Sequence, residues 1–239
     1  VKWENVAKDT FLSLYGYDKN VIEYFNEKKT LSGYNGVIYL PREFMLDVDG
    51  NKVEEAQEKT LKLVSILNNL GVPTNIYFSG RGFHIGIPDC SFKWKPDVNL
   101  HLKVKDELDK RGIYEFADVS VTDKTRIIRL NNTLNSKSKL WKIYITNEEL
   151  CELNALGIKA LANKPRQIEI PILQCEPVFD VTEREVKKQT IKFKETIGKE
   201  PDPMLYPCIQ TMMKGTTYGG RHATALRLAA WLRWRYPEN

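Results

Sequence analysis

Apolar and polar residues alternate with two different periods along this chain, and together the periods predict interleaved strands and helices. Apolar side chains recur at helical spacing from Val53 to Leu70, and Gly71 then ends this predicted helix. A second helix is predicted to run from Asp97, its capping residue, to about Arg111. Short apolar runs bounded by turn residues predict strands at 37–40, 44–48, 75–78, 83–88 and 140–145.

The two ends of the chain are less regular. Residues 6–15 and 21–25 each carry apolar side chains at helical spacing, which predicts two short amphipathic helices. Residues 163–177 are punctuated by proline and are expected to be irregular. Residues 199–203 resemble a linker, and residues 204–234 predict two helices separated by a Gly-Gly pair.

Two acids follow one of the predicted strands. Because side chains alternate along an extended strand, Asp47 and Asp49 point to the same side. Leu46 and Val48 face the other side, where they can be buried. Two carboxylates so close repel each other unless protons or cations lie between them. Oxygen ligands of this kind suit Mg²⁺ or Mn²⁺, so the sequence predicts a site for hard metal ions.

Two other interpretations fit the Asp-x-Asp-Gly pattern. The acids can simply end the strand in a solvated turn. An EF-hand would place ligands at Asp47, Asp49, Asn51 and Glu58. Its essential glycine would then have to stand at Lys52, and the preceding run is a strand instead of a helix, so the EF-hand is excluded.

The segment Ser79-Gly-Arg81-Gly-Phe-His84 joins two predicted strands. No helix opens after its glycines, which excludes the Rossmann and P-loop phosphate-binding turns. A hairpin tip with exposed backbone amides, a guanidinium and an imidazole forms a phosphate-binding set. The alternative is structural, with Ser79 and Arg81 serving the turn and His84 held by hydrogen bonds.

The second half of the chain adds further charged candidates. Asp118 begins an alternating run that predicts a strand, which could end beside the first two acids, and Asp123 is a competing third acid. Near the C-terminus, Arg221, Arg227 and Arg233 are interleaved with tryptophans, a pattern that can grip a nucleic-acid backbone. The alternative there is an amphipathic helix whose arginines face water.

The amino-acid composition says more about the cellular compartment of the protein than about its function. The 239 residues are 42% hydrophobic and 28% charged, and the formal net charge of +5 permits a nucleic-acid partner without requiring one. The four cysteines form no Cys-x-x-Cys pair, so a compact zinc site or a disulfide framework is not expected. A reducing cytoplasm fits best, and no apolar run approaches the length of a membrane span.

Three segments resemble, in order, the three motifs of the archaeo-eukaryotic primase superfamily. They are the Asp-x-Asp strand, the Ser-Gly-Arg-Gly-Phe-His hairpin and the run from Asp118 to Leu130 with its Arg-Ile-Ile-Arg-Leu ending. The match covers residues 42–146, about half the chain. The hairpin lacks the doubled arginine of the cellular primase small subunit and is more similar to the primase-polymerases of archaeal plasmids and of viruses.

The resemblance implies an α+β fold. Residues 1–182 would form the catalytic domain, with an N-terminal α/β unit and an RRM-like antiparallel sheet, and residues 183–239 a helical segment that begins an accessory domain. The implied activity is template-directed synthesis of primers or DNA from nucleoside triphosphates in replication, with two Mg²⁺ or Mn²⁺ ions. The catalytic and metal-binding acids would be Asp47, Asp49 and Asp118. The nucleotide-binding residues would be Ser79, Arg81, His84, Arg129 and Lys137.

The resemblance also implies partners. These are a single-stranded DNA template, nucleoside triphosphates and, for extension, an RNA or DNA primer. A helicase or further domains of the same polypeptide would complete such a protein, and we expect the present chain to be a fragment of a longer one. Apart from the resemblance, the pattern of C-terminal arginines among tryptophans predicts a further contact with nucleic acid.

The chain departs from the family pattern in several places, and two rival functions remain open. Asn135 stands where many members carry a histidine, which leaves its role in phosphate binding open. The cysteine and histidine cluster of the small subunit is missing, so no zinc is expected. Cys208 would match the first iron–sulfur ligand of the primase large subunit, but no partners follow it and no cluster is expected. The rivals are an inactive primase-like module that only binds nucleic acid, and another metal enzyme such as a nucleotide cyclase or a nuclease.

Overall fold

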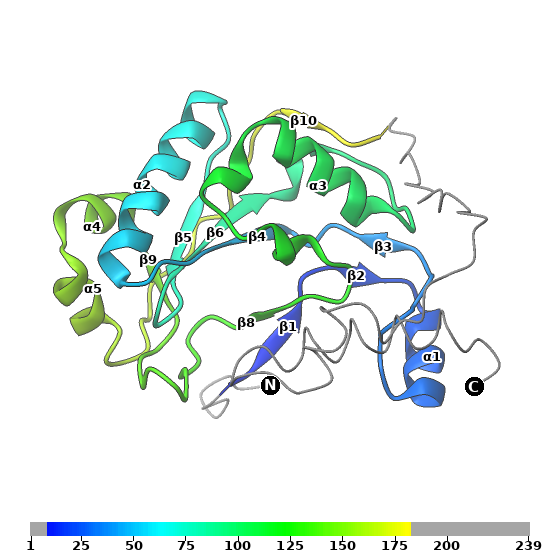
Figure 1. Ribbon diagram of the computed structural model, residues 1–239, viewed down its shortest axis with the longest axis horizontal. Coiled ribbons are helices and arrows are strands. Elements are labelled where there is room, and N and C mark those ends of the chain that lie inside the picture. The colour runs from blue at the N-terminus through cyan, green and yellow to red at the C-terminus, as the bar shows by residue number, and fades with distance from the viewer. Residues whose placement is uncertain (1–8, 183–239) are drawn as a thin grey trace, which may run out of the picture. The chain divides into compact units, whose positions relative to one another are not determined.

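Four antiparallel strands form the central sheet, in the order β4–β6–β5–β9 (Figure 1). They belong to residues 9–182, the part of the chain that the computed structural model describes. Strand β6 lies between β4 and β5, which helix α2 connects, so these elements form a split β-α-β unit. Their bounds are β4 (Glu43–Val48), α2 (Val53–Asn69), β5 (Asn75–Phe78), β6 (Phe83–Pro88) and β9 (Ile143–Ile145).

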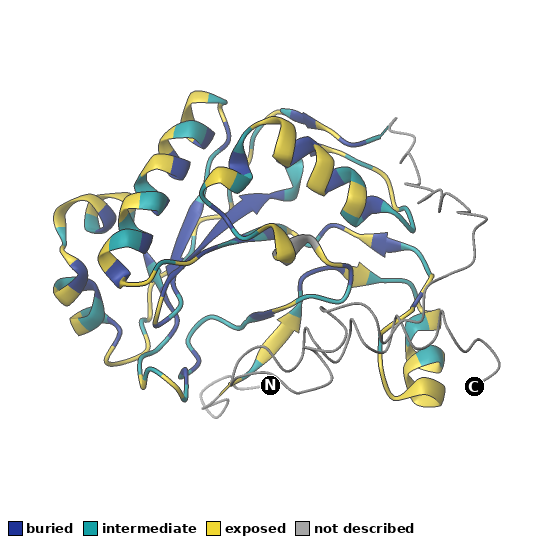
Figure 2. Cartoon of the chain, in the orientation of Figure 1, coloured by how far each residue is buried: buried dark blue, intermediate teal, exposed yellow. Residues whose placement is uncertain are grey.

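One face of this sheet is apolar and the other is polar. Phe44, Leu46 and Val48 of β4 are fully buried, and they pair with the equally buried Ile87, Ile85 and Phe83 of β6. Together with the apolar side chains of α2 and of α3 (Leu100–Lys110) they form the main core. Figure 2 shows the dark blue strands beneath the helices, whose outer faces are exposed. The helices therefore cover the apolar face and leave the polar face to the site.

Three further strand pairs surround the sheet. Strand β1 pairs with β8 and β2 with β3, both antiparallel, and β10 pairs with β7 in parallel. The remaining elements are β1 (Phe11–Ser13), β2 (Gly16–Tyr17), α1 (Asn20–Lys28), β3 (Ile38–Tyr39), β7 (Phe92–Lys93), β8 (Ile127–Arg129), α4 (Asn147–Glu152), α5 (Ala155–Leu161), β10 (Phe179–Asp180) and the 3₁₀ turns η2 (Asp89–Ser91), η3 (Ile113–Glu115) and η4 (Val119–Thr122).

The α+β class predicted from the sequence is confirmed. An RRM-like sheet would place its last strand beside the first, whereas β9 pairs with β5 at the opposite edge. The helix predicted over 6–15 is wrong in its described part, because Phe11–Ser13 pairs as a strand with β8. The helix predicted from Asp97 begins at Leu100 instead. The helical segment predicted at 183–239 lies outside the described residues.

No helix within residues 9–182 combines the length and the apolar character needed to cross a membrane.

Candidate functional site

The polar face of the sheet brings Asp47 next to His84. The two residues are direct cross-strand partners in β4 and β6, and His84 Nε2 lies 3.6 Å from Asp47 Oδ1. Burial lowers the pKa of His84 well below its ordinary value, and the positive charges of Lys142, Arg129 and Arg126 lower it further. The imidazole is therefore neutral near pH 7. Its Nδ1 is buried and has no hydrogen-bond partner among the described residues.

Three carboxyl groups approach one another at the end of β4. The backbone N–H of Asp118 donates to the carbonyl oxygen of Asp47 over 2.8 Å. One guanidinium nitrogen of Arg126 lies 3.8 Å from the Asp47 carboxylate and 3.9 Å from that of Asp118. Burial raises the pKa of Asp47 to about 7, and the charges of Asp49 and Asp118 add to the rise although Arg126 opposes it. Asp47 thus sits where an anion is unfavourable without a nearby cation.

Asp118 does not begin a strand, contrary to the sequence prediction. It caps the 3₁₀ turn η4, and its carboxylate accepts from the Ser120 N–H at 2.8 Å and from the Ser120 hydroxyl at 2.6 Å. Such local side-chain bonds compete with strand pairing. Asp123 accepts from the Thr125 N–H at 3.3 Å in the next turn, whereas the backbone of Asp118 is bonded to that of Asp47.

The carboxylates lie close to one another, but they do not form a complete set of metal ligands. Within residues 9–182, no three His, Cys, Asp or Glu side chains are arranged to hold a metal ion. Both oxygens of the Asp118 carboxylate already accept hydrogen bonds from Ser120.

Glycines let the hairpin between β5 and β6 approach the acids. Gly80 has a φ of +95°, a conformation that side chains strongly disfavour. A Cβ on Gly82 would lie 2.5 Å from the Val48 carbonyl oxygen and 2.7 Å from Asp49 Oδ1. The Ser79 hydroxyl donates to the Gly82 carbonyl over 3.1 Å, and this hydrogen bond closes the turn. These contacts explain the glycines on both sides of Arg81.

The loop after β8 is fastened to the hairpin by Asn135. Its side-chain NH₂ donates to the Ser79 carbonyl at 3.2 Å, while its oxygen accepts from the Lys137 N–H at 3.0 Å. Asn135 is buried and so serves the shape of this loop. Arg129 lies at the base of the loop, where its guanidinium covers the Phe11 ring at 4.7 Å from the centroid.

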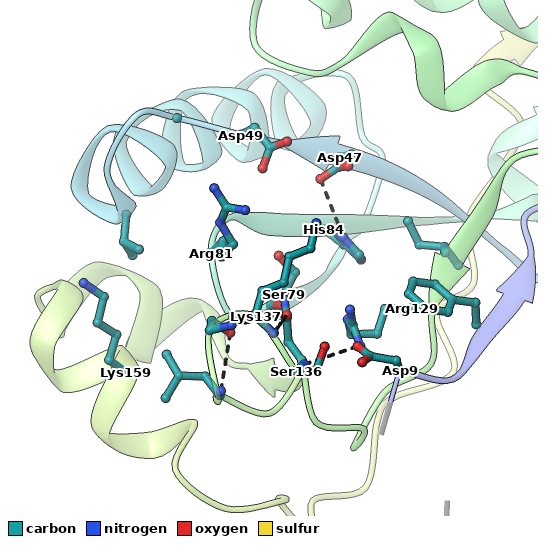
Figure 3. Close-up of a pocket in the computed structure, with 18 of the residues that line it drawn as sticks. Asp9, Asp47, Asp49, Ser79, Arg81, His84, Arg129, Ser136, Lys137 and Lys159 are labelled. Carbon is teal, nitrogen blue, oxygen red and sulfur yellow. Dashed lines mark hydrogen bonds and ion pairs between the residues drawn. The ribbon is translucent and has the colours of Figure 1, made fainter. Parts of the chain in front are cut away.

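Asp47, Asp49 and the basic residues line one pocket of about 1170 Å³ (Figure 3). Asp118 is beside Asp47 but does not line this pocket, whereas the other residues predicted from the sequence do. Those residues are Asp47, Asp49, Ser79, Arg81, His84, Arg129 and Lys137. The C-terminal candidates Arg221, Arg227 and Arg233 lie outside the described residues.

Several residues of the site were not predicted from the sequence. Asp9, Arg126 and Lys159 also line the pocket. Arg126 could have been found, because it lies three residues before Arg129 in the same motif. Asp9 and Lys159 come from segments far from the motifs, and only the fold brings them to the pocket.

A buried lysine supports the site from beneath. Lys142 is almost completely inaccessible, and its ammonium donates to the Arg129 carbonyl at 2.8 Å and lies 4.9 Å from the Tyr77 ring centroid. Burial lowers the pKa of Lys142 to about 7, although Glu43 and Asp47 oppose the shift. The Tyr77 hydroxyl donates to Glu43 over 2.8 Å. Lys142, Glu43 and Tyr77 therefore form a group of buried polar side chains on the polar face of the sheet, next to the site.

No protein-family model matches the chain, and a search of curated proteins gives no significant match.

Proposed function

We propose that the chain is a template-directed nucleotidyltransferase, which makes primers or DNA from nucleoside triphosphates on a single-stranded DNA template. One observation carries the proposal. Carboxylates at the end of β4 and the cationic side chains of Arg81, Arg129 and Lys137 line the same pocket. An enzyme that joins nucleotides needs this combination, because the acids hold metal ions and the cations hold the triphosphate.

The acids fit hard divalent cations. All the donors are oxygens, and burial, followed by the charges of Asp49 and Asp118, raises the pKa of Asp47, so a nearby cation would stabilise its charged form. Asp47, Asp49 and Asp118 would hold two Mg²⁺ or Mn²⁺ ions. When bound, such ions lower the pKa of an attacking 3′-hydroxyl and offset the charge of the leaving pyrophosphate.

The other residues of the pocket have roles that follow from their charge. Arg81, Arg129 and Lys137 would bind the phosphates of the incoming nucleotide, with the two guanidinium groups able to bind in a bidentate manner. The low pKa of His84 makes it a neutral group, so it would orient a phosphate through one N–H instead of adding a positive charge. Catalysis would then rest on positioning and charge neutralisation.

The test measures products. The protein is incubated with a single-stranded template, labelled deoxynucleoside or ribonucleoside triphosphates, and Mg²⁺ or Mn²⁺, with and without a primer, and the products are sized. Elongated strands support the proposal. Cyclic nucleotides or shortened strands would identify a cyclase or a nuclease. Binding of DNA without any incorporation would identify an inactive binding module and overturn the proposal.

A further inference from the structure

A carboxylate from the beginning of the described chain lies among the phosphate-binding groups. Asp9 precedes β1, whose pairing with β8 places Phe11 opposite Arg129. The Asp9 carboxylate accepts from Arg129 Nη1 at 2.8 Å and from the Ser136 backbone N–H at 3.2 Å, and the Ser136 side chain contributes a further hydrogen bond. Figure 3 shows Asp9 inside the pocket, between Arg129 and Ser136.

The donors that hold Asp9 are those expected of a phosphate site. A guanidinium together with a backbone N–H in a loop binds phosphate and carboxylate oxygens alike. Lys137 follows directly in the same loop and also lines the pocket. The Arg129 guanidinium also covers the Phe11 ring, and Nη1, the nitrogen that binds Asp9, donates in addition to the Leu134 carbonyl over 3.2 Å. The donors are therefore in place before any ligand arrives.

We infer that Arg129 and the Ser136 N–H form the subsite for the outermost phosphate of a nucleoside triphosphate, and that Asp9 fills this subsite until that phosphate displaces it. The inference rests on the proposed function. It adds the binding position of the outermost phosphate and identifies Asp9 as a group of the protein that competes with this phosphate.

Two features of Asp9 suit a displaceable group. Its φ of +46° lies in the left-handed region, which is unfavourable for a residue other than glycine. Its side chain is 37% exposed, whereas that of Arg129 is 11% exposed, so a ligand can reach the carboxylate while the guanidinium stays in place. The hydrogen bonds from Ser136 and the pair with Arg129 lower the pKa of Asp9 to about 2, so Asp9 carries its charge at neutral pH.

Displacement is expected to favour the triphosphate. A solvent-exposed ion pair contributes little net stability, whereas a terminal phosphate has three oxygens and more negative charge for the same donors. A diphosphate or a monophosphate whose first phosphate lies at the acids would not reach Arg129. Asp9 would then weaken the binding of the triphosphate alone.

The experiment compares binding of dATP, dADP and dAMP in the presence of Mg²⁺ by titration calorimetry. Asp9→Asn keeps the shape of the side chain and an oxygen acceptor but removes the charge. It is expected to tighten dATP binding about three- to tenfold and to leave dADP and dAMP within about twofold. The matched control is Glu54→Gln, which removes an exposed carboxylate that lines the same pocket. It is expected to leave the ratio of dATP to dADP affinity unchanged.

Other outcomes overturn the inference. Weaker dATP binding by Asp9→Asn would mean that Asp9 positions Arg129 for the ligand. Equal tightening of all three nucleotides, or the same change in Glu54→Gln, would reflect overall charge alone. Asp9→Ala repeats the comparison without any acceptor, and thermal melting of each variant shows that it is folded. If the wild-type protein extends primers but Asp9→Asn binds dATP unchanged, only the inference fails. If the wild-type protein neither binds nucleotides nor extends primers, the proposed function itself fails.

Discussion

Asp118 is bound to Asp47 through the backbone, by the 2.8 Å hydrogen bond from its N–H to the Asp47 carbonyl. The bond joins the turn η4 to the end of β4, and it involves neither carboxylate. The two acids therefore stay neighbours whatever their side chains bind. Arg126 lies beside both carboxylates and partly balances their charge.

Because the backbone holds these positions, the acids can be changed without loss of the fold. Asp47→Asn and Asp118→Asn are each expected to lower nucleotide incorporation by at least about a hundredfold, since an amide binds a divalent cation poorly. The melting temperature of Asp47→Asn should stay equal to or above that of the wild-type protein, because burial and the neighbouring acids disfavour the charge of Asp47. Asp118→Asn should melt slightly lower but remain folded, because Ser120 and Arg126 favour the charged form of Asp118. The matched control is Asp123→Asn, which should remain active. Loss of activity in Asp123→Asn with retention in Asp118→Asn would reassign the third acid.

Lys142 makes stability depend on pH. Its pKa of about 7 in the folded protein lies below the ordinary value of 10.5, so between these values the unfolded chain binds the extra proton. Stability should therefore rise as the pH increases from 7 to 9, with a contribution of up to about 1.4 kcal/mol per pH unit from this one group. Urea denaturation at several pH values measures the slope. Lys142→Met should flatten it, and equal slopes for both proteins would show that Lys142 does not carry the effect.

Local patterns predicted those parts of the fold that depend on neighbouring residues. Helix α2 and the hairpin strands β5 and β6 were found because their periodicity and glycines lie within one short segment. The segment 6–15 has helical spacing, yet Phe11–Ser13 becomes a strand because its partner β8 lies more than a hundred residues away. Pairing over such a distance overrides local preference.

The same limit applies to the site. The chemistry of each motif predicted a metal site at Asp47 and Asp49 and a phosphate site at the hairpin, and the family resemblance implied that the two work together. Asp9 has no motif of its own, and its partners Arg129 and Ser136 become visible only in the fold. Lys142 has a weaker signal, since a lysine inside a predicted strand must face the polar side of the sheet or be buried at a cost.

Lys29 offers a test of the N-terminal part of the fold. It ends helix α1 with a φ of 55°, and its N–H donates to the Phe25 carbonyl over 2.8 Å. Glycine adopts this conformation without strain and keeps the hydrogen bond, so Lys29→Gly should stabilise the protein by about 0.5–1 kcal/mol. Lys28→Gly, one residue earlier and inside the helix, should destabilise it by about as much. Urea denaturation of both variants checks the opposite signs, and a loss of stability in Lys29→Gly would contradict the left-handed end of α1.

Gly82 tests whether the close approach of the hairpin to the acids matters for activity. A Cβ at this position would lie 2.5 Å from the Val48 carbonyl and 2.7 Å from Asp49 Oδ1, which is closer than real contacts allow. Gly82→Ala should therefore push the hairpin away from β4, destabilise the protein by about 1–3 kcal/mol and lower incorporation more than tenfold. The control is Gly71→Ala, where no atom lies within 4 Å of the added Cβ but φ is +77°, so only backbone strain is introduced. It should cost a similar amount of stability and leave activity per folded molecule intact. Equal activity of the two variants would show that the acids do not depend on contact with the hairpin.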